Sequence, residues 1–222
     1  MKPTDFLIDF ESLSTVPESV IVEVSIVPFK DDPENPMSFQ DLVAKGKKFK
    51  LDLASQKGKR HIMASTVNWW KEQDAAARKN LVPAPGDLTV NEAVDQILDF
   101  LKVNNCDLWK SQLWCRGMSF DIPIWINMLQ ERFGVKDTGK LEPTAFWNGR
   151  DVRTAIEAIA LTRGLTMTPL RKGLLPGFVM HDSIHDCAKD VLMLQYIKRY
   201  AMGLETAPTE AESDPVTVKK RM

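Results

Sequence analysis

The sequence predicts one α/β domain in which a mixed β-sheet is flanked by helices. Three observations predict it. A length of 222 residues suits a single domain with a substantial core. Strand-like segments come first, and strand-like and helix-like segments then alternate. Neither an internal repeat nor a long linker divides the chain, so we expect the domain to span residues 1–204, followed by a polar, frayed tail over residues 205–222.

Three segments in the first quarter of the chain have the patterns of strands. Residues 6–11 are apolar apart from Asp9 and Glu11, as in a buried strand. Residues 20–29 are rich in β-branched side chains. Residues 48–53 alternate charged and apolar side chains, which favours an edge strand. Two shorter strands are expected at residues 112–115 and 145–148.

The helices follow from apolar spacing and from their start and stop signals. The first is expected to begin at Ser65 or Thr66, either of which can serve as its N-cap. A Pro- and Gly-rich stretch over residues 166–178 predicts irregular structure before the last helix. The predicted helices cover residues 65–79, 90–102, 121–132, 151–163 and 186–202.

Composition narrows the class of protein. Hydrophobic residues make up 44% and charged residues 27% of the chain, as in soluble globular proteins. The apolar runs are all shorter than the roughly 18 residues of a membrane span, and the N-terminus lacks a signal-peptide pattern. Three cysteines without metal-type spacing favour a reducing cytoplasm. A net charge of −1 neither supports nor excludes a nucleic-acid partner.

Two carboxylates share one face of the first strand. Asp9 and Glu11 are two residues apart, so their Cα atoms lie roughly 6.6 Å apart on the same side of the strand. Buried together they repel each other unless divalent cations lie between them. The alternative is a strand end that emerges into solvent and carries two solubilising acids.

Asp121 follows the strand at residues 112–115, where a helix is expected to begin. Helix capping alone would explain an Asp at this position. A His-x₄-Asp pair, His185 and Asp190, opens the last helix. On an ideal helix these two would point roughly 140° apart, so we expect His185 in the preceding loop and Asp190 one turn inside the helix. The alternative is a polar helix start in which Asp182 or Asp186 is the cap.

In this order the segments resemble the motifs of the DEDDh (DnaQ-like) 3′→5′ exonuclease superfamily. Asp-x-Glu lies on the first strand, Phe-Asp at a later strand–helix junction and His-x₄-Asp on the last helix. Within the superfamily the chain also resembles DNA exonucleases of T-even phages, over nearly its whole length. The segments that carry this closer resemblance are residues 9–12, 68–71, 114–121 and 181–190.

The resemblance implies a ribonuclease-H-like fold with a five-stranded mixed sheet, one antiparallel strand and helices on both faces. It implies two divalent metal ions, Mg²⁺ or Mn²⁺, and a general-base histidine at His185. In the superfamily the residue after the motif Glu is usually Thr or Ser, as Ser12 is here, and the next residue lies near the terminal base. The resemblance therefore implies that Ser12 and Leu13 contact substrate, with Leu13 near that base. The implied metal-binding acids are Asp9, Glu11, Asp121 and Asp190.

The expected activity is 3′→5′ hydrolysis of DNA, which releases nucleoside 5′-monophosphates and favours single strands. Trp69 and Trp70 point about 100° apart on a helix, so one can pack inside while the other offers a base a stacking surface. The alternative is that both are structural. Three other functions stay open: an exoribonuclease with the same acids, a catalytically silent nucleic-acid-binding module, and a metal-stabilised structural domain. The first stays open because only one or two contacts to the 2′ position of the sugar distinguish RNA from DNA.

Overall fold

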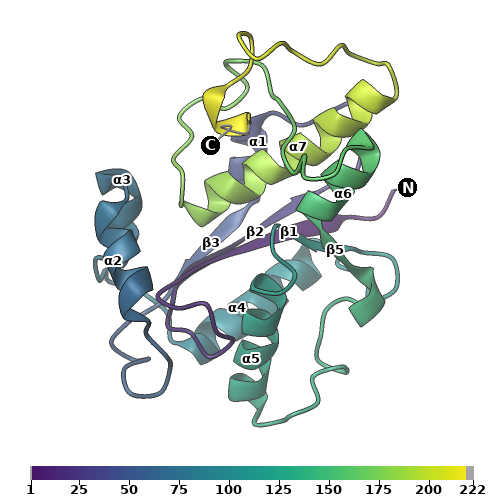
Figure 1. Ribbon diagram of the computed structural model, residues 1–222. Coiled ribbons are helices and arrows are strands. Elements are labelled where there is room, and N and C mark those ends of the chain that lie inside the picture. Colours follow the sequence, from purple (N-terminus) through teal and green to yellow (C-terminus); the bar gives the residue numbers. More distant parts are fainter. Residues whose placement is uncertain (1, 219–222) are drawn as a thin grey trace.

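A five-stranded mixed sheet forms the centre of the protein, here a computed structural model that describes residues 2–218 (Figure 1). Its strand order is β3-β2-β1-β4-β5. β2 is antiparallel to β1 and to β3, whereas β4 and β5 run parallel to β1. The predicted mixed sheet with one antiparallel strand is therefore confirmed. The strands are β1 (Asp5–Ser12), β2 (Ile21–Phe29), β3 (Lys47–Lys50), β4 (Leu113–Cys115) and β5 (Gly149–Asp151).

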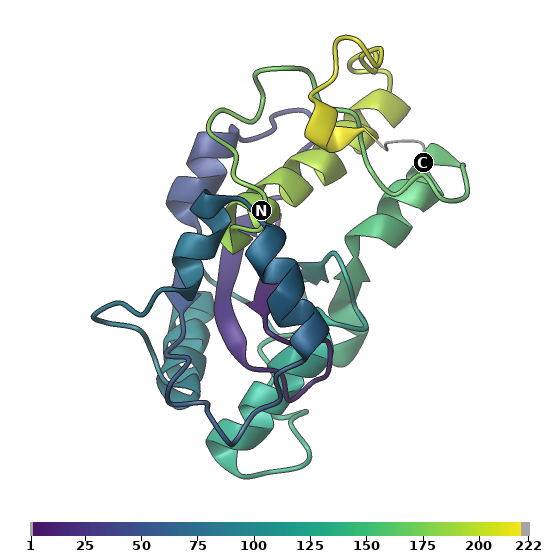
Figure 2. The ribbon, with the colours of Figure 1, turned by 60° about the vertical axis from the view of Figure 1, so that its left-hand side comes forward.

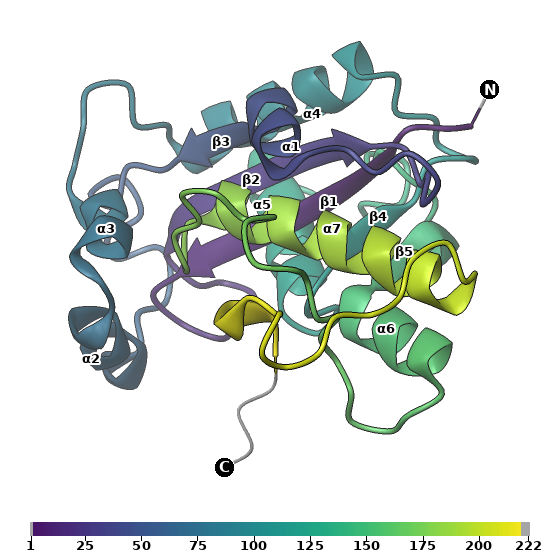
Figure 3. The same cartoon turned by 90° about the horizontal axis from the view of Figure 1, so that it is seen from above.

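Helices cover both faces of the sheet. In Figures 1 and 3, α4 and α5 lie on one face, and α1, α6 and α7 on the other. α2 and α3 stand beyond the carboxyl end of β1, and Figure 2 shows α2 in front of that end of the sheet. The α-helices are α1 (Phe39–Lys45), α2 (Ala64–Glu72), α3 (Ala75–Arg78), α4 (Val90–Val103), α5 (Asp121–Phe133), α6 (Val152–Ala160) and α7 (Ser183–Ala201). Single 3₁₀ turns are η1 (Lys79–Leu81), η2 (Phe146–Asn148) and η3 (Pro215–Thr217).

The alternation of side chains along β1 divides the core into two layers. Phe6, Ile8 and Phe10 are buried against α4 and α5. Leu7 is buried on the opposite face, against α6 and α7. Asp9 and Glu11 have the same parity as Leu7, so they project from the face that α7 covers. The strand therefore carries two carboxylates into the layer between the sheet and α7.

Several boundaries differ from the sequence prediction. α7 begins at Ser183, three residues before the expected start, so His185 lies inside the helix and not in the loop. Residues 145–148, expected to be a strand, contain the turn η2, and the edge strand follows at Gly149–Asp151. The short helix α1 was not predicted. Only seven residues long, it gives a weak periodic signal.

The tail is packed as far as residue 218, contrary to the expected fraying. Asp214 donates its backbone N–H to the Leu170 carbonyl at 2.8 Å, and Leu170 donates to Thr217 Oγ1 at 3.0 Å. Ser213 and Thr217 are each 1% exposed. These contacts are long-range in sequence, so local composition does not reveal them. Within residues 2–218, no helix has the length and apolar character that crossing a bilayer requires.

Candidate active site

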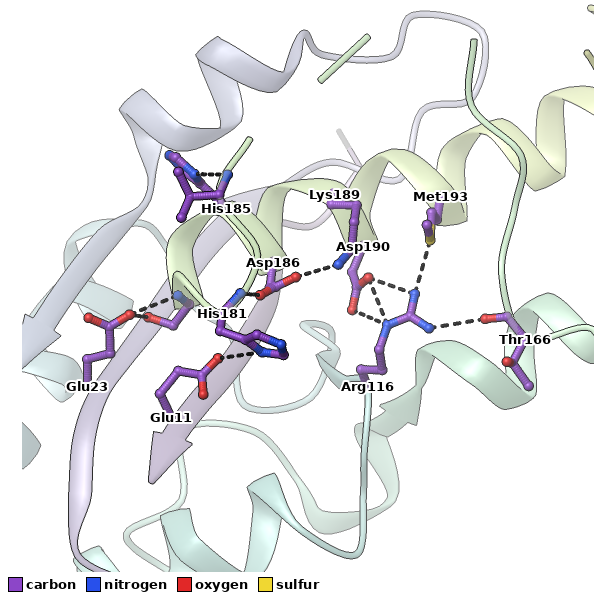
Figure 4. Close-up of polar contacts among 12 residues, drawn as sticks. Glu11, Glu23, Arg116, Thr166, His181, His185, Asp186, Lys189, Asp190 and Met193 are labelled. Carbon is purple, nitrogen blue, oxygen red and sulfur yellow. Dashed lines mark hydrogen bonds and ion pairs between the residues drawn. The ribbon is translucent and has the colours of Figure 1, made fainter. Parts of the chain in front are cut away.

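A group of carboxylates converges where β1 and β4 end and α7 begins. β1 supplies Asp9 and Glu11, and Asp121 is the first residue of α5, which follows β4. α7 supplies Asp186 and Asp190 from its first two turns. Figure 4 shows Glu11, Asp186 and Asp190 along the side of α7 that faces β1. Parallel strands end at the same edge of a sheet, and ligand sites of α/β folds gather at that edge.

Asp121 is tied to the end of β1 and does not cap its own helix. Its Oδ1 accepts the Phe10 N–H and its Oδ2 accepts the Gly117 N–H, each at 3.2 Å. The N-cap of α5 is Phe120, whose side chain makes no capping bond within the described chain. Burial raises the pKa of Asp121 to about 7, even though both backbone N–H groups act to lower it. This carboxylate is held in a fixed position at a high cost to its charged form.

The β1 carboxylates are destabilised in the same way. Burial and the nearby charges of Asp121 and Glu11 raise the pKa of Asp9 well above its ordinary value. Burial also raises the pKa of Glu11, against the effect of His181. Buried acids with too little compensating charge favour the binding of cations. Oxygen donors of this kind suit hard divalent ions such as Mg²⁺ or Mn²⁺.

His181 is the histidine that the fold brings to these acids. Its Nδ1 lies 3.7 Å from Glu11 Oε1, and its backbone N–H donates to Asp186 Oδ2 at 2.8 Å. The hydrogen-bonding and charge of Glu11 raise the pKa of His181. Glu11, His181 and Asp186 each offer a ligand atom, and these three atoms lie within 4.8 Å of one another. Figure 4 shows the three side chains together.

His185 lies elsewhere. Its Nδ1 accepts the Val179 N–H at 3.0 Å, and its ring centroid lies 5.4 Å from that of Phe39 and 6.3 Å from that of Phe178. In Figure 4 it is separate from Glu11 and His181. The structure therefore does not bring the sequence-predicted base to the carboxylates. The side chain has instead a packing role between α7 and α1.

Asp190 reaches the cluster but is occupied by Arg116. The Arg116 Nε lies 2.9 and 2.8 Å from the two oxygens of Asp190, and Nη2 lies 2.7 Å from Oδ1. Arg116 also donates from Nη1 to the Thr166 carbonyl at 3.1 Å. Both Asp190 oxygens are thus already in charge-assisted bonds, of the kind that fix a carboxylate in place. Asp186 also has partners, Lys189 and the His181 N–H, but it faces Glu11.

A pocket of about 520 Å³ opens beside the carboxylates. Its volume is in the usual range for small-ligand sites, about 300–1,000 Å³. Glu11, Ser12 and Trp69 are among the residues that line it. Trp69 is 39% exposed, and its ring centroid lies 4.7 Å from that of His181.

The other two residues predicted to contact substrate are not in the pocket lining that the described chain provides. Trp70 is 1% exposed and donates from Nε1 to the Ser12 carbonyl at 2.9 Å. Leu13 pairs through its backbone with Val20 and Met63. Of the two adjacent tryptophans, one therefore supports the turn after β1 and the other borders the pocket.

Comparison with known proteins gives the family. Residues 4–197 match the Rv2179c-like family, which is described as a 3′-5′ exoribonuclease Rv2179c-like domain. The chain belongs to this exonuclease family. An exodeoxyribonuclease of Enterobacteria phage T4 is 48% identical over 221 residues, which cover 96% of this chain and 97% of the phage protein. The 3′→5′ exonuclease class expected from the sequence is confirmed.

Solved structures of exonuclease I share the fold at low identity. Apo exonuclease I matches with a TM-score of 0.57 at 13% identity, over 89% of this chain and 42% of the other. A zinc-bound complex of E. coli exonuclease I with single-stranded DNA matches with a TM-score of 0.55 at 13% identity, over 92% of this chain and 41% of the other. This chain thus spans about two fifths of the length of the exonuclease I chains. The match confirms the ribonuclease-H-like fold that the sequence predicted.

Proposed function

We propose that this enzyme removes nucleotides from the 3′ end of DNA by divalent-metal-dependent hydrolysis, with release of nucleoside 5′-monophosphates. The observation that carries the proposal is the cluster of buried acids with raised pKa values beside a histidine. Such a cluster is costly without cations and suits them when they bind. A single structural ion would not need a pocket open to solvent beside it.

The positions of the acids support one ligand set. Asp9, Glu11, Asp121 and Asp186 would hold two divalent ions. Asp190 was the fourth acid expected from the sequence, but Arg116 already engages both of its oxygens. When bound, the ions supply positive charge that stabilises the charge developing on the scissile phosphate. No covalent enzyme intermediate is needed, because phosphoryl chemistry depends mainly on positioning and electrostatics.

His181, and not His185, is proposed as the general base. The His181–Asp186 pair has the same five-residue spacing as His185–Asp190, so the motif occurs twice in overlapping positions. With Nδ1 turned to Glu11, the Nε2 atom of His181 is left to accept the proton of the attacking water. His185 has its Nδ1 committed to Val179.

The pocket is proposed to receive the terminal nucleotide. Ser12 and Trp69 line it, and the exposed ring of Trp69 offers a base a stacking face. The enzyme should prefer single strands if a terminal base must separate from its pairing partner before it can enter the pocket. Trp70 and Leu13 would not contact the substrate and would act only by fixing the shape of the turn after β1.

DNA is proposed as the substrate because the T4 relative is named an exodeoxyribonuclease and matches along nearly the full length of both chains. RNA is the second candidate, because the matching family is described by exoribonuclease activity. The host cytoplasm is the proposed compartment by analogy with that phage protein.

One assay tests the exonuclease activity and the preference for DNA or RNA together. Matched DNA and RNA oligonucleotides labelled at the 5′ end are offered with Mg²⁺ or Mn²⁺, in single-stranded and duplex form. Stepwise shortening of the DNA from its 3′ end, abolished by EDTA, is the expected result. Preferential shortening of RNA would move the assignment to exoribonuclease. Release of the labelled 5′ nucleotide first, or cleavage of circular DNA, would overturn the exonuclease polarity.

A further inference from the structure

The first turn of α7 is capped from the sheet. The side chain of its N-cap, Asp182, makes no capping hydrogen bond within residues 2–218. Instead Glu23 of β2 accepts both the backbone N–H and the hydroxyl of Ser183 through Oε1, each at 2.9 Å. Figure 4 shows this carboxylate directed at the helix start. A negative charge here satisfies an orphan N–H and suits the helix dipole, so β2 fixes where α7 begins.

Lys48 of β3 completes the arrangement. Its Nζ lies 3.3 Å from Glu23 Oε1 and 2.6 Å from Asp182 Oδ2. Glu23 is fully buried, and a buried carboxylate is costly without a cation beside it. In the part of the chain that the structure describes, Lys48 is the one residue that forms ion pairs with both acids. Two strands therefore hold two consecutive residues, Asp182 and Ser183.

His181 directly precedes these residues and has an unfavourable backbone. Its φ of 61° lies in the left-handed region, which is uncommon for residues other than glycine. Such a conformation is costly and persists only where the surroundings enforce it. The enforcing contacts on one side are those of Lys48 and Glu23. On the other, the His181 N–H donates to Asp186 Oδ2.

We propose that Glu23 and Lys48 are positioning residues that fix the start of α7 and thereby hold the His181 imidazole against Glu11. This inference rests on the proposed function, in which His181 is the general base. Glu23 is the cross-strand partner of Glu11, so one β1–β2 pair positions both the acid and the loop that carries the base. Without Lys48 and Glu23, the turn relaxes and the imidazole moves away from the water that it deprotonates.

The chain offers a matched control for Lys48. Lys50 lies two residues further along β3 and has a similarly exposed side chain, 21% against 24%. It forms an ion pair with Asp87 at 2.8 Å. Asp87 lies in the loop before α4, so Lys50 is directed away from His181. Lys48→Met and Lys50→Met therefore remove equivalent groups from one strand, and only the first disturbs the start of α7.

Single-turnover cleavage with strand affinity measured separately tests the proposal. Lys48→Met is expected to lower the rate by about 10- to 100-fold, the scale of a small misplacement of a catalytic group. Strand affinity changes little, Lys48→Arg restores much of the rate, and Lys50→Met behaves as wild type. In a His181→Ala background, Lys48→Met has no further effect, because a residue that acts through His181 is silent once His181 is gone.

Glu23→Gln is the second variant, since it removes the charge and avoids the unpaired buried carboxylate that Lys48→Met leaves. In metal-free protein, amide exchange at Ser183 is expected to rise in Lys48→Met and Glu23→Gln and to stay unchanged in Lys50→Met. Independent, additive losses in the double variant, or equal losses in Lys50→Met, would overturn the proposal. Normal cleavage by His181→Ala would instead contradict the assignment of the general base to His181. The amide-exchange data at Ser183 would still decide whether Glu23 and Lys48 fix the start of α7.

Discussion

Removal of divalent metal should make stability fall as pH rises, because burial raises the pKa of Asp121 from 3.8 to about 7. The folded pKa lies above the unfolded one, so the folded protein binds more protons between these values. The stabilising contribution is complete below about pH 4 and is lost as pH rises through about 7. Between about pH 4 and about pH 7 each pH unit corresponds to about 1.36 kcal/mol, so the loss attributable to Asp121 is on the order of 4 kcal/mol.

Urea unfolding in EDTA, at about pH 4 and about pH 8, measures this loss. Asp121→Asn is the matched variant, because it carries no charge and its single side-chain oxygen can still accept one of the two N–H groups, that of Phe10 or that of Gly117. The other hydrogen bond is lost at every pH, so only the pH dependence is compared. Wild type should lose stability relative to the variant as pH rises, and Mg²⁺ should narrow the difference at the higher pH. Identical pH dependence in the two proteins, or no effect of Mg²⁺, would refute the electrostatic account of the site.

The remaining predictions concern ligands and the pocket. Glu11→Ala and Asp186→Ala should nearly abolish cleavage with circular dichroism unchanged, and full activity in excess EDTA would contradict a metal mechanism. Asp186→Asn should weaken Mn²⁺ binding by calorimetry more than Asp190→Asn does; the reverse order would restore the sequence-based choice of Asp190. Trp69→Ala should raise KM and Trp69→Phe should largely preserve it, because stacking needs an aromatic face. Trp70→Phe should instead cost about 1 kcal/mol of stability through its lost hydrogen bond, and an unchanged KM in Trp69→Ala would exclude stacking there.

The sequence predicted those parts of the site that depend on local periodicity. Asp9 and Glu11 share a strand face because side chains alternate, and the structure has them on one face beneath α7. Asp121 was placed at a strand–helix junction, where it lies. Its bond from the Phe10 N–H was not predicted, because Phe10 is 111 residues away in sequence.

The start of the last helix shows where sequence reasoning failed. The segment contains two overlapping His-x₄-Asp pairs, and local signals do not choose between them. Asp186 was an acceptable cap for a helix beginning there. The actual start is set by Glu23, 160 residues earlier in the chain, which accepts the Ser183 N–H. Once α7 begins at Ser183, His185 is helical and is directed away from the acids.

The most direct test of the account compares His181→Ala with His185→Ala by single-turnover cleavage of a 5′-labelled DNA strand, with Mn²⁺ affinity measured separately. We predict that His181→Ala loses roughly 10²–10⁴-fold in rate, the usual effect of removing one acid–base group. Strand affinity should change much less, because proton removal matters mainly in the transition state. His185→Ala should keep its rate and lose only packing against Phe39 and Phe178. A crippled His185→Ala beside a normal His181→Ala would contradict the assignment of the base to His181.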